Sequence, residues 1–126
     1  MIKLIGMAFS IIVLIASPCS AQELTRPQKN AVRSANSYLE FSSFSRNGLI
    51  FQLSSEYGGG YDVRDATVAV DSLSVDWNTQ AVRSANSYLE MSGFSCNSLI
   101  KQLSSEYADK YTQSQARYGA QQAGAC

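Results

Sequence analysis

The chain has 126 residues, and its ten basic and ten acidic side chains give a formal net charge of zero at pH 7. Nucleic-acid binders need a basic surface to neutralise phosphates, so this balance argues against DNA or RNA as a partner. The chain also contains no histidine. Because histidine is the commonest general base and a frequent metal ligand, we expect no enzymatic activity, no metal and no cofactor.

Residues 1–21 have the layout of an export signal. Lys3 supplies a positive start, residues 4–16 are apolar apart from one serine, and Pro18 then interrupts the run. Small residues ahead of Gln22 favour cleavage after Ala21, as in a secretory signal peptide. The apolar run is shorter than the ~20 residues that a membrane-spanning helix needs.

Two other interpretations of this N-terminal segment stay open. It can remain uncleaved as a membrane anchor with Lys3 on the inner side. Alternatively, Cys19 can be the lipid-modified cysteine of a lipoprotein, although the preceding Pro18 disfavours that processing. Each interpretation places residues 22–126 outside the cytoplasm, in the periplasm or at the periplasmic face of the inner membrane.

A 27-residue segment occurs twice, at residues 31–57 and 81–107, with only five differences. Apolar residues recur at helical spacing in both copies, and turn residues separate them, so we expect an all-α fold. It should consist of two tandem three-helix, helix-turn-helix-like repeats over residues 22–74 and 75–126, with the second repeat truncated.

Local signals give the expected helix starts in each copy. The first helix begins near Pro27 or Trp77, and the second follows a serine N-cap, with a hydrophobic staple across the first turn. Its apolar face is expected to run from Leu49 to Tyr57, until three glycines end the helix. The third helix begins after Asp62 or Thr112. Most tyrosines are expected at core or half-core positions.

Three residues form a candidate contact surface: Phe51, Trp77 and Lys101. Phe51 and Lys101 occupy equivalent positions, and a site that accepts both is expected on the surface. The alternative is that Phe51 fills the seam between the two units. Trp77 is expected to wedge between the units, with a binding hot spot as the second interpretation.

Two cysteines, Cys96 and Cys126, form a candidate disulfide. An oxidising compartment favours their pairing, and the flexible segment before Cys126 lets it reach Cys96. The alternative is that both thiols are incidental, because the first copy has Arg46 at the position of Cys96.

A set of positions spaced through the first copy and the linker carries a family resemblance: Ala31, Ser34, Ala35, Tyr38, Leu39, Phe44, Ser45, Leu49, Leu53, Tyr61, Ala66, Leu73, Asp76, Trp77, Asn78 and Ala81. This pattern resembles the Ltp-type repeat of the host cell surface-exposed lipoprotein family. The resemblance covers nearly all of residues 22–126 as two copies. The chain departs from the family because it lacks a convincing lipobox, which puts lipid anchoring in doubt.

The resemblance implies a superinfection exclusion protein of a temperate phage or prophage. Such a protein blocks injection of incoming phage DNA across the host inner membrane by contact with the injection machinery, such as the tape measure protein, or with a host inner-membrane component. It implies a compact helical repeat that does not bind DNA. Membrane association through the N-terminus is compatible with this role, and the sequence leaves the oligomeric state open.

Two other classes of function compete with this interpretation. A periplasmic adaptor that binds a host-envelope component, without a phage role, would have the same composition. A secreted hydrolase would need a base beside the serines of the SSEY motif, such as Ser54 and Ser104, or a paired set of glutamates. The sequence offers neither, so we expect a binding protein.

Overall fold

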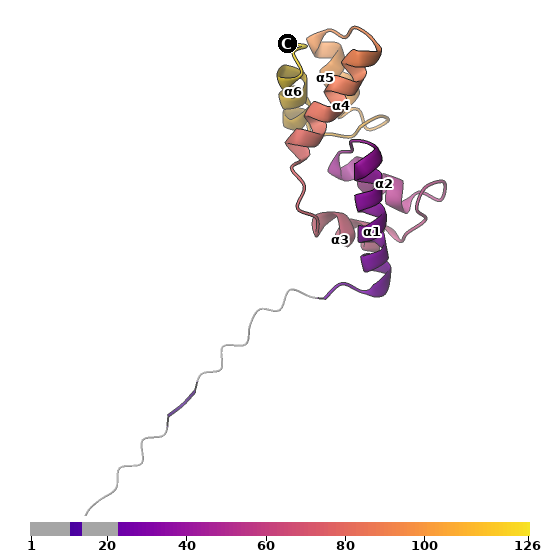
Figure 1. The fold of residues 1–126 in the computed structure, drawn as a ribbon, viewed down its shortest axis with the longest axis vertical. Helices are drawn as coiled ribbons and strands as arrows, with labels where there is room; N and C mark the ends of the chain where they lie inside the picture. The colour runs from indigo at the N-terminus through magenta and orange to yellow at the C-terminus, as the bar shows by residue number, and fades with distance from the viewer. Residues whose placement is uncertain (1–10, 14–22) are drawn as a thin grey trace, which may run out of the picture.

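The computed structural model describes residues 11–13 and 23–126, and residues 23–126 contain six helices and no strand. Figure 1 shows these helices as two groups placed one beyond the other along the molecule. The prediction of two tandem three-helix repeats is confirmed. The helices are α1 (Arg26–Phe41), α2 (Arg46–Ser54), α3 (Val63–Asp71), α4 (Trp77–Met91), α5 (Cys96–Ser104) and α6 (Gln113–Gln122).

The predicted signal peptide or anchor falls almost entirely outside the described residues. Only residues 11–13 of it are described, and they form neither helix nor strand. In the described part of the chain, every helix is too short or too polar to cross a membrane. The interpretation of residues 1–21 therefore stays a prediction from the sequence.

Each helix begins at a residue that can satisfy its free backbone N–H groups. Thr25 and Thr112 form capping boxes, in which the threonine hydroxyl accepts from a backbone N–H and a glutamine three residues later reaches back. Ser45 caps α2, and Asp62 caps α3. These are local interactions between near neighbours in sequence, so the sequence pattern located most helix starts correctly.

Each repeat has its own small core. In the first repeat, alanines of α1 and α3 and leucines of α2 are buried, and α1 and α2 both pack against α3. The second repeat has the same arrangement, with α4 and α5 against α6. Gly119 allows α6 to approach α4 closely: a Cβ there would lie 2.7 Å from the backbone of Ala81. The buried apolar residues are Ala31, Ala35, Leu49, Leu53, Ala66, Ala69, Val70, Ala81, Ala85, Leu99, Leu103, Tyr111, Ala116 and Ala120.

The second helix of each repeat ends earlier than the sequence suggested. It stops at Ser54 in the first repeat, because Ser55 adopts extended backbone angles and a tight turn comes next. Tyr57 and Tyr107 are consequently 94% and 99% exposed, so the prediction that Tyr57 belongs to the apolar helical face is wrong. The turn needs a positive φ at its end, which Gly60 supplies in the first repeat and Lys110 in the second.

The two repeats meet through loops and side chains. The closely packed helix pairs all lie within one repeat. Trp77, the first residue of α4, packs against the core of the first repeat. The prediction of a tryptophan wedged between the units therefore matches the position that the structure gives it.

The expectation that the last helix of the second repeat is cut short is not met. Helix α6 has 10 residues and α3 has 9, so the helix itself is of full length. In the first repeat the chain continues after α3 into the linker and α4. In the second repeat it ends at Cys126, shortly after α6.

Candidate interaction surfaces

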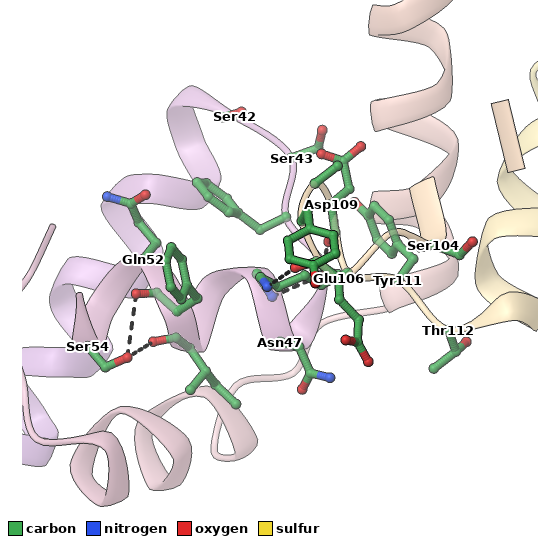
Figure 2. Close-up of a pocket in the computed structure, with 18 residues that line it drawn as sticks. Ser42, Ser43, Asn47, Gln52, Ser54, Ser104, Glu106, Asp109, Tyr111 and Thr112 are labelled. Atoms are coloured by element: carbon green, nitrogen blue, oxygen red, sulfur yellow. Dashed lines mark hydrogen bonds between the residues drawn. The ribbon is translucent and has the colours of Figure 1, made fainter. Parts of the chain in front are cut away.

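A groove of about 1120 Å³ lies where the two repeats meet. Figure 2 shows that side chains of both repeats face it, with Ser43, Gln52 and Ser54 on one side and Asp109 and Tyr111 on the other. The first repeat contributes residues from the end of α1 to the end of α2. The second contributes the turn between α5 and α6. The groove is thus built from segments fifty or more residues apart.

The cap of α2 also holds the second repeat in place. The Ser45 hydroxyl accepts from the backbone N–H of Gly48 at 2.9 Å and donates to the backbone carbonyl of Asp109. Gly48 favours this close approach, because a Cβ there would lie 3.2 Å from the Asp109 carbonyl oxygen and 2.9 Å from the Ser45 hydroxyl. The second repeat has Ser98 at the position of Gly48, and α5 has no such neighbour to accommodate.

Hydroxyl groups extend this contact along α4. Ser43 Oγ lies 2.7 Å from Ser84 Oγ, which itself lies 2.7 Å from the Tyr111 hydroxyl. One residue further along, the backbone N–H of Phe44 donates to Gln80 Oε1 at 3.2 Å. Ser84 and Tyr111 are buried. Their hydroxyl groups are hydrogen-bonded, as buried polar groups usually are.

Phe51 lies in the groove and remains 58% exposed. The Lys110 ammonium lies 5.1 Å from the centre of its ring, within the range of a cation–π interaction. Both sequence interpretations of Phe51 therefore describe part of what is seen: the ring is on the surface, and it also contacts the other repeat.

Asp109 carries the least satisfied group of the groove. Its Oδ2 atom is buried and has no hydrogen-bond partner among the described residues. Burial raises the pKa of the Asp109 carboxyl above its usual range, and a hydrogen bond from Tyr88 offsets part of that shift. Burial also raises the pKa of Tyr111, against a smaller opposing effect from its hydrogen bond to Ser84.

The structure does not bring the three predicted contact residues together. Phe51 lines the groove between the repeats, whereas Lys101 lines a separate hollow of about 400 Å³ between α5 and α6. Trp77 lines neither of them. The three residues thus lie at separate places, and their role as contact residues stays a prediction.

Cys96 and Cys126 form a disulfide with a sulfur–sulfur distance of 2.13 Å. It joins the first residue of α5 to the end of the chain. In the first repeat, Arg46 stands at the position of Cys96 and makes two hydrogen bonds to Asp71, at 2.6 and 2.8 Å. Both residues at this variable position therefore tie the start of the second helix to the segment at the end of the third.

The serines and acidic residues considered for catalysis are not assembled into a site. Ser54 and Ser104 donate to the backbone carbonyls of Ile50 and Ile100, the usual role of a serine near a helix end. Among the residues that the structure describes, no group of three or more cysteine, aspartate or glutamate side chains could hold a metal ion.

Sequence reasoning missed Asp109, Lys110 and Gly48 as residues of the groove. A signal was present, because Gly59 and Gly60 of the first repeat stand where the second has Asp109 and Lys110. Comparing the copies beyond the duplicated segment would have singled out this turn. That comparison would not have shown that the turn contacts α2 of the other repeat.

The fold and these surfaces define a class: a small all-α protein of two tandem helical repeats, with a groove at the junction. The family model described as host cell surface-exposed lipoprotein matches residues 27–73 and 76–122. The chain belongs to that family. Both matches fall within the repeats expected at residues 22–74 and 75–126.

One solved structure is similar over most of the chain. It is that of Ltp, a superinfection exclusion protein from the Streptococcus thermophilus temperate phage TP-J34. The sequences are 28% identical, the TM-score is 0.70, and the match covers 79% of this chain and 97% of that one. No curated protein sequence matches the chain.

Proposed function

We propose that this protein is a superinfection exclusion protein of a temperate phage or prophage. The observation that carries the proposal is the similarity to Ltp of phage TP-J34, which extends over 97% of that chain and includes both repeats. Sequence identity of 28% accompanies the shared fold, so the likeness is more than a common helical architecture.

The mechanism that we propose is protein–protein contact without catalysis. The repeats present grooves and exposed aromatic side chains, and the serines of the SSEY motif are engaged at helix ends. The protein would act at the outer face of the host cytoplasmic membrane, after export directed by residues 1–21. Its partner there would be the phage injection machinery, such as the tape measure protein, or a host inner-membrane component that the machinery uses.

The proposal is tested by expressing the chain in a phage-sensitive host and challenging it with related phages. We expect normal adsorption with loss of DNA entry, measured by phage binding and by release of labelled phage DNA into the cell. The matched control is the chain without residues 1–21, which would stay in the cytoplasm and should give no protection. Unchanged plating of every phage tried would contradict the role.

Phages that escape exclusion identify the partner. We expect their substitutions in a gene of the injection machinery, with the tape measure gene as the first candidate. Escape that arises only through changes in host membrane proteins would instead favour a host component as the partner. The readout is the genome sequence of independent escape isolates and of resistant hosts.

A further inference from the structure

The two repeats have equivalent surfaces, but only the one on the second repeat is covered by other residues of the chain. In the second repeat this face consists of Gln80, Ser84 and Tyr111, which we call the Ser84 face. These residues are only 8%, 6% and 3% exposed, because residues 43–45 of the first repeat lie against them.

The corresponding residues of the first repeat, fifty positions earlier, are Asn30, Ser34 and Tyr61, which we call the Ser34 face. Asn30 is exposed and Ser34 and Tyr61 are partly exposed. All three line an open hollow of about 490 Å³, together with Arg33 and Tyr38.

The covered copy shows what such a face binds. Residues 43–45 approach the Ser84 face as the last residues before a helix, with Ser45 as the N-cap of α2. The face contacts a serine hydroxyl, from Ser43, and accepts a hydrogen bond from the next backbone N–H, that of Phe44. Phe44 precedes the N-cap Ser45, so its backbone N–H lies outside the helical hydrogen-bond ladder and is available to the face.

The Ser34 face retains the same recognition groups. Ser34 Oγ lies 2.8 Å from the Tyr61 hydroxyl, as Ser84 does from Tyr111 at 2.7 Å. In the second repeat Ser84 has Ser43 as an additional partner, whereas no additional partner of Ser34 is present in the described chain. Asn30 offers the same amide group as Gln80 on a side chain one methylene shorter. The hydroxyl pair is therefore preformed and has hydrogen-bonding capacity left.

A second copy of this chain fits the Ser34 face poorly. Its free segment equivalent to residues 43–45 has Gly93 in place of Ser43, so the hydroxyl that reaches the face is missing. It also has Ser98 in place of Gly48, where a Cβ crowds the approaching turn of the other repeat. These differences would weaken head-to-tail addition of further copies, which a heterologous interface otherwise permits.

We propose that the Ser34 face is a docking surface for a segment of a different protein. The partner presents a serine or threonine, followed by a free backbone N–H, immediately before a helix. This assignment rests on the contacts within the tandem repeat and not on the exclusion role. A negative phage challenge would therefore leave it standing.

The probe is a synthetic peptide with the sequence of residues 41–54, added to the isotope-labelled full chain as exported and followed by NMR. We expect saturable shifts at Asn30, Ser34 and Tyr61. A matched peptide with Ser43→Gly should bind about fivefold more weakly, the effect of one neutral hydrogen bond. Ser34→Ala in the protein should weaken binding of the first peptide by a similar factor.

If the peptide binds too weakly to detect, a second measurement tests the same surface. The full-chain variant Gly93→Ser/Ser98→Gly restores the docking sequence at the free end of the second repeat. We expect it to associate with increasing concentration in light scattering, more than the unmodified chain, and to lose that association when Ser34→Ala is added. Either positive result supports the proposal.

Three outcomes overturn the docking surface. The first is the absence of both the peptide-induced shifts and the association of the variant. The second is a set of shifts confined to the Ser84 face, which would mean that the peptide only competes with the internal contact. The third is equal binding of the two peptides, which would show that the serine hydroxyl is not recognised.

Discussion

Asp109 makes one favourable and one unfavourable contribution to the folded state, the first through its backbone and the second through its side chain. Its carbonyl accepts from Ser45, which fixes the turn against α2. Its carboxyl atom Oδ2 is buried and has no hydrogen-bond partner among the described residues. A buried acceptor without a hydrogen bond costs about 1–3 kcal/mol, so this side chain is expected to lower the stability of the folded state.

Asp109→Asn is expected to stabilise the protein at pH 7 by about 1 kcal/mol, because it removes a buried charge. Burial raises the pKa of the Asp109 carboxyl in the folded state. The cost of its charge is therefore absent below the unfolded pKa and appears as pH rises through the folded pKa. The stabilisation by Asp109→Asn should therefore vanish at acidic pH. The measurement is the free energy of urea unfolding at several pH values.

Asp71→Asn is a control that is expected to change the stability at pH 7 in the opposite direction. The hydrogen bonds from Arg46 lower the pKa of the Asp71 carboxyl, so its contribution is present above the unfolded pKa and is lost as pH falls through the folded pKa. The two side chains are 41% and 48% exposed, so the loss at pH 7 should stay below about 1 kcal/mol. A destabilising Asp109→Asn at pH 7 would show that the carboxylate is favourable where it lies.

At the scale of the helices, each repeat closes itself with a tie between its second helix and the end of its third. The first repeat uses the exposed ion pair of Arg46 with Asp71, and the second uses the disulfide of Cys96 with Cys126. The first repeat continues into α4, and Trp77 packs back on its core. In the second repeat the disulfide ties down the segment after α6, where Ala123 and Ala125 also pack against the core.

Reduction of the disulfide is expected to lower the free energy of unfolding by about 2–4 kcal/mol, because the bond closes a loop of 30 residues. Cys126→Ser should have the same effect and should make unfolding insensitive to reductant. The measurement is urea unfolding followed by circular dichroism with and without dithiothreitol. An unchanged midpoint on reduction would show that packing of α6 against α4 holds the chain end by itself.

The helices were predictable where the signal is local. Ser45, Asp62 and Thr112 each act within three residues of their own position, so the sequence pattern alone located them. The end of α2 was not predictable in this way, because Tyr57 continues the helical spacing yet lies in a turn closed by backbone hydrogen bonds. Asp109 was missed because its role depends on Ser45, 64 residues away in sequence.

At the scale of the molecule, the differences between the copies are concentrated at contacts that only one copy makes. Ser43, Gly48 and Phe51 of the first repeat all contact the second repeat or allow its approach. Their equivalents Gly93, Ser98 and Lys101 belong to the second repeat and make no such contact among the described residues. The sequence interpretation of these differences as surface positions is thus incomplete. Three of the five differences fall where the first repeat contacts the second.

Gly48→Ser is expected to loosen the junction while leaving both repeats folded, because its Cβ would crowd the Asp109 carbonyl oxygen at 3.2 Å. The measurement is ¹⁵N relaxation of the full chain. We expect residues of α1–α3 and α4–α6 to share one rotational correlation time in the unmodified protein and to show two shorter ones in the variant.

Gly93→Ser is the matched control for this experiment. It makes the same chemical change at a glycine where an added Cβ would meet no atom within 4 Å, so it should leave the relaxation of both repeats unchanged. Serine also favours a helix more than glycine, so Gly48→Ser should gain local stability in α2 even as the junction loosens. If the variant kept a single correlation time, the hydroxyl contacts of Ser43 with Ser84 would be sufficient to fix the two repeats against each other.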